Sequence, residues 1–370
     1  MTKLTELCDI QYGYAFDSQR FTEDASYPQL ARIRDVKRGY SETYYSGEYP
    51  EEYILSAGDL LIGMDGEFNI ARWKIDGALL NQRVCKVKAK PDTDEEYLRF
   101  LLVKALKEIE NRTSYVTVKH LSAKELNKLV LDVPAYDIQE KRAKVLSKLE
   151  AIISARQTEL VKLDELIKAR FVELFGDPVN NSKGLPEATL PELGDFGRGV
   201  SKHRPRNDPK LLGGSYPLIQ TGDVASAELY ITDYEATYSE LGLKQSKMWD
   251  KGTLCITIAA NIAKTAILTF DACFPDSVVG FMANEKTSNI FIHYWFSFFQ
   301  AILEAQAPES AQKNINLKVL SELKVISPSK ETQEEFENFV KQVDISRVVI
   351  QKALNEVQVL FDSLMQHFFG

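Results

Sequence analysis

Two long stretches of the chain place apolar residues at alternating steps of three and four positions, which is the heptad spacing of helices that coil together. The first lies between residues 138 and 175, without Pro or Gly, and the second follows 194 positions later. The heptad positions of the first are Leu146, Leu149, Ile153, Arg156, Leu160, Leu163, Ile167, Arg170 and Leu174. Those of the second are Val340, Val343, Arg347, Ile350, Leu354, Val357, Phe361, Leu364 and Phe368. Both stretches are predicted to be long helices that pack against each other.

The segments before these helices have a different pattern, with short apolar runs broken by Gly, Pro and Asp. Examples are YILSAGDLLIGM, LLNQRVCKV, GTLCITIA and TAILTF. Such runs predict strands and turns, with one helix at about 97–110 and a counterpart near 290–305. Each half of the chain is therefore predicted to be a mixed α/β domain followed by one long helix.

The two halves repeat one unit. P-x-x-x-x-Q-E occurs at Pro134 and again at Pro328, an offset of 194 (328 minus 134), and Phe-Gly pairs at 175 and 369 keep that offset. Earlier in each half the register shifts. L-x-x-L-x-D begins at 4 and at 190, and YPQLARIRDV at 27 corresponds to YPLIQTGDV at 216. AGDLLIGM at 57 corresponds to KGTLCITI at 251, again at an offset of 194.

The repeated proline motif predicts where each domain ends. Proline cannot continue a helix, so Pro134 and Pro328 are expected to end the last strand of their domains. Asp137-x-x-Glu140 and Thr332-x-x-Glu335 then resemble capping boxes at the helix starts.

Connectivity predicts that the two helices are antiparallel, because the first leads into the second domain and the second must return along it. The predicted fold class is α+β: two homologous α/β domains joined by two long antiparallel coiled-coil helices, a pseudo-twofold dumbbell. The predicted limits are 1–136 for the first domain, 137–176 for the first helical spacer, 177–330 for the second domain and 331–370 for the second spacer.

Composition narrows the class of protein. With 370 residues, 44% hydrophobic and 26% charged, the chain is typical of a globular protein of two domains. The most apolar stretch, at 291–303, is too short and too polar to cross a bilayer, so a cytoplasmic protein without membrane contact is expected. The four cysteines, at 8, 85, 255 and 273, are far apart and are expected to be buried apolar residues rather than metal ligands.

Two homologous domains that begin L-x-x-L-x-D, carry a G-D/T-L-x-I strand and end in P-x-x-x-x-Q-E before a long helix resemble the specificity subunit of a Type I restriction-modification system. The resemblance covers nearly the whole chain. It implies two target recognition domains that each recognise one half of a bipartite sequence in double-stranded DNA. It also implies helices that set the spacing and dock two DNA methyltransferase subunits, with restriction subunits as further partners. S-adenosylmethionine, ATP and Mg²⁺ would then belong to the partners, and this chain would carry no cofactor and no catalytic residue.

Candidate DNA-binding residues fall in three groups, despite the net charge of −8, because binding depends on where charge lies. The first group comprises the polar segments near each start, where loops can present aromatic and basic side chains: Tyr12, Tyr14, Arg198, Lys202, Arg204 and Arg206. The second has the side chains that bond guanine and adenine edges: Arg32, Arg34, Lys37, Arg38, Gln220 and Thr221. The third lies in later loops, where Asp65 and Glu67 would accept from cytosine amino groups: Glu67, Asn69, Gln82, Arg83, Asn261 and Lys264. Lys119 and Lys313 occupy one repeat position and are candidates for a backbone contact.

Each candidate has a plainer interpretation as a solvated turn or a surface charge. A coiled-coil interaction protein that does not recognise DNA would share the architecture. A standalone nuclease would need a metal at Glu309 and at Glu322 with Lys324, but the repeat lacks that pattern, and Glu322 fits the solvated face of a short helix. The chain has no G-x-x-x-x-G-K-S/T, G-x-G-x-x-G, H-E-x-x-H or N/D-P-P-Y/F motif.

Overall fold

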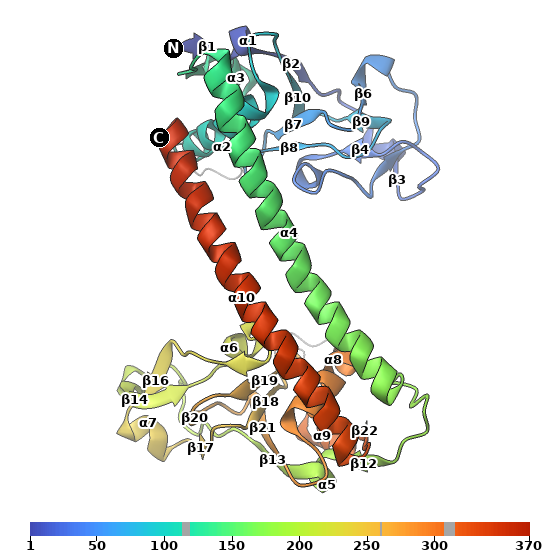
Figure 1. Ribbon diagram of the computed structural model, residues 1–370, viewed down its shortest axis with the longest axis vertical. Coiled ribbons are helices and arrows are strands. Elements are labelled where there is room, and N and C mark those ends of the chain that lie inside the picture. Colours follow the sequence, from blue (N-terminus) through green and yellow to red (C-terminus); the bar gives the residue numbers. More distant parts are fainter. Residues whose placement is uncertain (113–118, 260, 307–314) are drawn as a thin grey trace. The chain divides into compact units, whose positions relative to one another are not determined.

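The chain forms two compact units (Figure 1). The computed structural model describes residues 1–112, 119–259, 261–306 and 315–370. Unit 1 comprises Met1–Gln157 and Lys352–Gly370, and unit 2 comprises Thr158–Gln351. Both unit boundaries fall inside long helices, and the domain limits expected from the sequence stay a prediction. Within the described ranges, no helix combines the length and apolarity needed to span a bilayer.

Unit 1 is built around a four-stranded sheet in the order β2-β10-β7-β8, joined by smaller sheets β4-β9-β6, β3-β5 and β1-β11. Among the described residues of this unit, the strand pairings are antiparallel except that of β4 with β9. Its strands are β1 (Thr2–Lys3), β2 (Cys8–Tyr12), β3 (Phe21–Thr22), β4 (Leu30–Ala31), β5 (Tyr44–Tyr45), β6 (Ile54–Leu55), β7 (Leu60–Gly63), β8 (Asn69–Arg72), β9 (Ala78–Leu80), β10 (Val84–Ala89) and β11 (Val130–Leu131). Its shorter helices are α1 (Leu4–Leu7), η1 (Ser18–Arg20), η2 (Ile33–Asp35), η3 (Glu51–Tyr53), α2 (Glu95–Arg112) and α3 (Ala123–Lys128).

Unit 2 has a five-stranded sheet in the order β13-β21-β18-β19-β15, a second sheet β16-β14-β20-β17 and the pair β12-β22. Its strands are β12 (Glu187–Thr189), β13 (Gly194–Arg198), β14 (Leu212–Leu218), β15 (Tyr230–Ile231), β16 (Ala236–Tyr238), β17 (Met248–Trp249), β18 (Leu254–Thr257), β19 (Thr265–Leu268), β20 (Ala272–Cys273), β21 (Val278–Ala283) and β22 (Lys324–Ile326). Its shorter helices are α5 (Leu190–Leu193), η4 (Pro209–Leu211), α6 (Thr221–Ser226), α7 (Glu240–Lys244), α8 (Asn289–Gln306) and α9 (Leu317–Glu322).

The internal repeat predicted from the sequence is present in the structure. The helices α2 and α8 start 194 positions apart and have the same length, as do α3 and α9. Strands β7 and β18, and β10 and β21, keep the same offset. Nearer the start of each repeat the offset falls to 186, for α1 against α5 and for β2 against β13. The later part of each repeat is therefore fixed in length, and the length differences lie in the first part.

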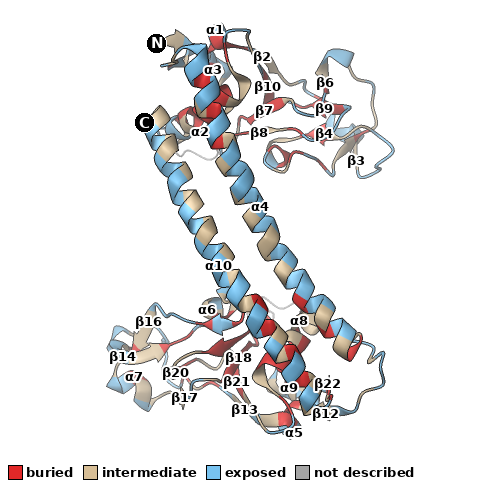
Figure 2. Ribbon diagram, in the orientation of Figure 1, coloured by how far each residue is buried: buried red, intermediate tan, exposed pale blue. Residues whose placement is uncertain are grey.

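The two long helices are α4 (Tyr136–Phe175) and α10 (Lys330–Phe369). In unit 1 the start of α4 meets the end of α10, where Arg142 Nη1 donates to the Phe368 carbonyl at 3.0 Å. In unit 2 the end of α4 meets the start of α10, where the rings of Phe171 and Phe336 have centroids 5.3 Å apart. The helices therefore run in opposite directions, as predicted. Every heptad position named above is buried or half-buried, and the remaining faces of both helices are largely exposed (Figure 2).

The predicted capping boxes are wrong in position. The helices begin at Tyr136 and Lys330, so Asp137 and Thr332 lie inside the first turn. In α10 the cap is Ser329, whose hydroxyl accepts from the Thr332 amide at 3.3 Å. Each helix begins two residues after the motif proline, one or two residues before the polar residues that the sequence pattern selected.

The Gln of the repeated motif joins each helix to its domain. Gln139 and Gln333 are 2% and 0% exposed. Each side-chain amide donates to the carbonyl of the motif proline, Pro134 at 2.9 Å and Pro328 at 3.0 Å. The Gln139 Oε1 accepts from the Asp94 amide at 3.0 Å, just before α2. A buried amide that bonds both the motif and the domain explains why the chain carries P-x-x-x-x-Q-E twice.

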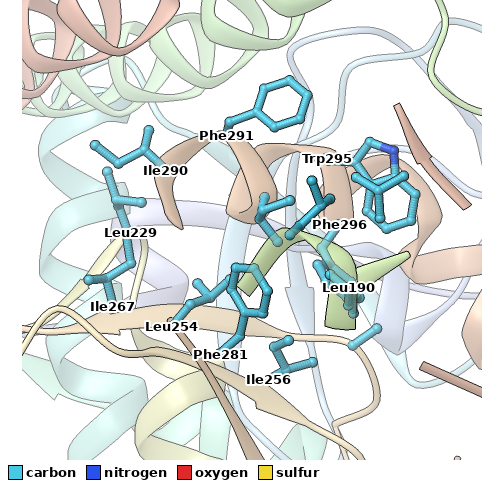
Figure 3. Packing of buried hydrophobic residues seen from close by; sticks show 14 of the residues in the cluster. Leu190, Leu229, Leu254, Ile256, Ile267, Phe281, Ile290, Phe291, Trp295 and Phe296 are labelled. Atoms are coloured by element: carbon cyan, nitrogen blue, oxygen red, sulfur yellow. The ribbon is translucent and has the colours of Figure 1, made fainter. Parts of the chain in front are cut away.

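The largest core lies in unit 2, where α5 and α8 pack on the strands of the main sheet (Figure 3). Phe291, Trp295 and Phe296 of α8 are fully buried there, and α4 and α10 add Phe171, Phe175 and Phe336 to the same core. The four cysteines are unpaired and buried, as predicted. Burial raises the pKa of the Cys8 and Cys85 thiols to about 12.

Candidate nucleic-acid interface

Three of the predicted arginines line one cavity in unit 1. Arg32, Arg34 and Arg38 surround a space of about 630 Å³ between η2 and the segment that leads into β5, and Phe21 forms part of its wall. The Arg32 guanidinium lies 5.8 Å from the centre of the Phe21 ring. A cavity that combines three guanidinium groups with an aromatic ring suits the phosphates and base edges of DNA.

The fully buried carboxylate of Asp35 holds this arrangement. It accepts a 2.9 Å bond from the Ser41 hydroxyl and a 3.3 Å bond from the Arg32 amide, and it pairs with Arg38. The bond to Asp35 raises the pKa of Arg38 above its usual value, so this guanidinium stays charged. Arg34 is exposed, and its Nη2 donates to the Thr43 hydroxyl at 3.4 Å. Buried Asp35 therefore fixes the backbone of the arginine segment and leaves Arg34 at the surface.

The predicted Lys37, Glu67 and Asn69 form a connected group beside η2. Lys37 Nζ lies 2.6 Å from Glu67 Oε1, and this bond lowers the pKa of the Glu67 carboxyl. Asn69 Nδ2 donates to the Glu67 carbonyl at 3.0 Å. A Cβ placed on Gly63 would lie 3.4 Å from Asn69 Nδ2 and 3.5 Å from Ile33 Cγ2 of η2. Lys37 thus compensates the charge of Glu67, which removes the repulsion from phosphate expected of a free carboxylate.

A second group in unit 1 contains Tyr14, Gln82 and Arg83. The backbone N–H of Gln82 donates to the Tyr14 carbonyl at 2.7 Å, and Tyr14 is 41% exposed. Arg83 Nη1 lies 3.2 Å from the His120 ring nitrogens, and its Nε lies 3.7 Å from Asp65. Tyr14 follows β2, and Gln82 and Arg83 lie in the turn between β9 and β10.

Two other candidates in unit 1 are directed into the fold. The Tyr12 hydroxyl donates to Asn127 Oδ1 of α3 at 2.9 Å, and burial raises the pKa of this tyrosine to about 12. Lys119 is 11% exposed, and its Nζ donates to the Glu110 carbonyl near the end of α2 at 2.7 Å. Both side chains hold elements of unit 1 together.

In unit 2 the structure brings together Arg206, Gln220 and Thr221, which line one cavity of about 230 Å³. Asp276 lies beside this cavity, between its lining residues Pro275 and Ser277. It pairs with Arg206 and with Arg204 at 3.3 Å, while Arg198 Nε donates to its carbonyl. Asp276 therefore brings three predicted arginines together, two through its carboxylate and one through its backbone carbonyl, and leaves an excess of positive charge.

The other candidates in the described part of unit 2 line neither the Arg32 cavity nor the Gln220 cavity, apart from the arginines bonded to Asp276. Lys202 and Asn261 are exposed, and neither lines the Gln220 cavity. Lys264 lines a different cavity of about 300 Å³, shared with Asp164 of α4 and Arg347 of α10. Lys313 and Glu309 lie outside the described residues. Glu322 is exposed on α9 and lies 3.7 Å from Lys318, and within the described residues no group of three or more His, Cys, Asp or Glu is placed to hold a metal ion.

The organising carboxylates were missed by the sequence candidates. Asp35 stands three residues after Arg32 and three before Arg38, a local spacing that can be recognised in a turn of helix. Asp276 is 70 residues from Arg206, and no sequence pattern links them.

A comparison with known families decides the identity of the fold. The model described as "Type I restriction modification DNA specificity domain" matches residues 1–164 and 189–358, one match in each repeat. The chain belongs to the Type I restriction-modification DNA specificity family.

The similarity to individual members of this family extends over nearly the whole chain. The chain is 29% identical over 393 aligned positions to the Type I restriction enzyme EcoBI specificity subunit of Escherichia coli, covering 98% of this chain and 83% of that one. Its fold resembles a Type-I restriction-modification S subunit from M. genitalium, with a TM-score of 0.60 and 16% identity over 100% of this chain and 95% of that one. A structure reported for complex assembly and conformational transition of a type I system gives a TM-score of 0.52 at 16% identity, over 100% and 96%.

Proposed function

We propose that this specificity-family chain recognises a bipartite sequence in double-stranded DNA, one half-site with the β-rich domain of each unit. The observation that carries this proposal is the pair of cavities. Arg32, Arg34 and Arg38 line one, and Arg206 and Gln220 line the other. Basic groups supply the phosphate contacts that position a protein on DNA, and arginine and amide side chains discriminate bases.

We further propose that the exposed helix faces dock two methyltransferase subunits. Apolar side chains stand in solvent on α10, where Ile345, Val348 and Val349 are 68%, 67% and 64% exposed. On α4, Val161 is 57% exposed. Exposed apolar patches of this kind mark interaction sites, and each helix spans 40 residues, so both have room for a partner. Restriction subunits would join this assembly.

Methyl transfer and ATP-driven cleavage belong, in this proposal, to those partners, which bring S-adenosylmethionine, ATP and Mg²⁺. The chain itself would act without catalysis. Support comes from the sequence, which lacks the phosphate-binding and methyltransferase motifs considered above.

The DNA contact is tested in the complex assembled with its methyltransferase subunits. Arg34→Ala removes an exposed guanidinium of the unit 1 cavity, and Lys141→Ala, which loses only an exposed pair with Asp137 at 3.2 Å, is the control. We expect Arg34→Ala to weaken DNA binding and to lower the slope of log affinity against log salt by about 1. Equal affinity of both variants and wild type would favour the interaction protein that does not recognise DNA.

Partner docking is tested separately. Val348→Glu places a charge on the exposed apolar face of α10, and Gln342→Glu adds the same charge at a nearby exposed polar position. We expect the first variant to lose co-purification with methyltransferase subunits and the second to keep it. If both variants co-purify as wild type does, the partner does not bind this face.

A further inference from the structure

Arg32 and Gln220 occupy the same place in the two repeats. Arg32 follows β4 and precedes η2, and Gln220 lies two residues after β14 and precedes α6. Their backbones have nearly the same conformation, with φ −107° and ψ 164° for Arg32 and φ −108° and ψ 172° for Gln220. The strand before each residue has a parallel partner, β9 in one unit and β20 in the other. The two positions are 188 apart (220 minus 32), within the part of the repeat where the offset varies.

A carboxylate three residues later fixes the backbone of both positions. The backbone N–H of Arg32 donates to Asp35 Oδ2 at 3.3 Å, and the backbone N–H of Gln220 donates to Asp223 Oδ2 at 2.7 Å. The sequence repeats this feature as Arg-x-x-Asp-Val and Gln-x-x-Asp-Val. The framework at this position is therefore the same, and the side chain that it presents is different.

Both side chains line an open cavity that also contains a positive charge. Arg32 shares its cavity with Arg34 and Arg38, and Gln220 shares its cavity with Arg206. Two of these neighbours are engaged in ion pairs, Arg38 with Asp35 and Glu42, and Arg206 with Asp276. Among the described residues, no acidic side chain lies within ion-pair distance of Arg32, and Gln220 is exposed.

We propose that Arg32 and Gln220 are the corresponding specificity-determining residues of the two domains. Arg32 recognises a guanine in one half-site, and Gln220 recognises an adenine in the other. Arginine bonds O6 and N7 of guanine as a pair, and glutamine bonds N6 and N7 of adenine in the same way. The paired arginines beside them hold the phosphates, so that each cavity separates backbone attachment from base recognition. This inference rests on the proposed function and assigns the bases that it leaves open.

The exchange of the two residues tests the inference. Arg32→Gln and Gln220→Arg each introduce the side chain that the equivalent backbone already carries in the other repeat, so both variants are compatible with the local fold. The wild-type and variant chains are assembled with their methyltransferase subunits, and the methylated sites in a DNA library are sequenced. Assembly of each complex is checked by size-exclusion chromatography.

We expect Arg32→Gln to change the specificity at one base position of one half-site, where the preference for guanine falls by about 10-fold or more. The other half-site should stay unchanged. Gln220→Arg should change one position of the opposite half-site, where adenine loses its preference.

Three outcomes overturn the inference. The first is a wild-type motif that lacks guanine in one half-site or adenine in the other. The second is that both variants alter the same half-site. The third is that the variants keep the wild-type motif and bind all sequences more weakly, which would identify the two residues as backbone contacts. These outcomes leave the proposed function intact, whereas a wild-type complex that methylates DNA without any sequence preference contradicts the proposed function itself.

Discussion

The junctions between the long helices and the domains can be compared position by position, because both follow the 194-residue offset. In unit 2, Phe175 at the end of α4 is fully buried against Phe291 of α8, with ring centroids 5.0 Å apart. In unit 1, the equivalent Phe369 at the end of α10 is only half-buried and lies 5.3 Å from Tyr97 of α2. The same geometry is thus built from aromatic core residues in one unit and from a more solvated contact in the other.

Polar contacts replace part of this apolar core in unit 1. Arg99 of α2 forms two bonds with Glu150 of α4, at 3.0 and 2.6 Å. Lys104 donates to the Phe369 carbonyl. At the positions equivalent to 99 and 104, α8 carries His293 and Phe298. At these equivalent positions the joint in unit 2 uses buried aromatic rings and the joint in unit 1 uses charged side chains, so the two should respond differently to mutation, pH and salt.

The largest expected effect separates the two terminal phenylalanines. Phe175→Ala removes a fully buried ring and should lower the free energy of unfolding of unit 2 by about 3–5 kcal/mol. Phe369→Ala, its repeat counterpart, should cost clearly less, because part of that ring is already in water. Calorimetry of both variants measures the difference. Equal losses would mean that the two joints are energetically alike.

The next effect concerns the feature that both joints share. Gln333→Leu removes an amide that donates to the Pro328 and Lys286 carbonyls, both at 3.0 Å, and accepts from the Thr287 hydroxyl at 3.1 Å. Buried partners left unpaired cost about 1–3 kcal/mol. Gln139→Leu should cost a similar amount in unit 1, and Glu334→Ala, at an exposed neighbour, should stay within about 0.5 kcal/mol of wild type. If Gln333→Leu leaves the free energy of unfolding in urea unchanged, the buried amide does not stabilise the joint.

The pH response should distinguish unit 2. Burial lowers the pKa of His293 to about 4, and its Nδ1 lies 2.9 Å from the Thr265 hydroxyl. The unfolded chain binds a proton at this histidine near pH 6.5, and the folded chain does not, so the stability present above pH 6.5 is lost as the pH falls toward 4.

Unfolding measured at pH 7.5 and at pH 5.5 should therefore show a loss of about 1 kcal/mol in unit 2. His293→Gln removes the titrating group and should reduce this loss. Arg99, at the equivalent position of unit 1, stays charged throughout this range. A variant that keeps the full pH dependence would show that other groups are responsible.

The smallest effect is the salt response of unit 1. Arg99 is 11% exposed and Glu150 is 49% exposed, so their ion pair is partly screened. Arg99→Ala should lower the stability of unit 1 by about 1 kcal/mol at low salt, and by less in 1 M NaCl. Denaturant unfolding at both salt concentrations measures this. A cost that does not change with salt would indicate that packing of the arginine stem, rather than its charge, is lost.

Much of the fold follows from the sequence because its signals are local or periodic. The heptad positions identify both helices, and the recurring motifs identify the repeat, since neither inference requires knowledge of distant contacts. The capping prediction failed because several polar residues compete for the start of each helix, and only the backbone decides among them. Gln139 and Gln333 were visible as a motif, but their role depends on neighbours more than 40 residues away.

The candidate site is less accessible to sequence reasoning. Composition selects residues that can contact DNA, such as Tyr12 and Arg34, but it does not show which side chain faces solvent. The Tyr12 hydroxyl bonds to Asn127, whereas Arg34 lines an open cavity. Arg204 and Arg206 lie together because both pair with Asp276, which is 72 and 70 residues away from them and lies between β20 and β21.

The burial of all four cysteines has a practical consequence. Thiolates, not thiols, react with maleimides, and burial keeps these native groups protonated, Cys8 and Cys85 with a pKa of about 12. A cysteine introduced on an exposed loop of each domain would therefore be the preferred site of dye attachment without removing any native sulfur. Such a doubly labelled chain provides a direct fluorescence readout of what happens to its two domains when DNA and partner subunits are added.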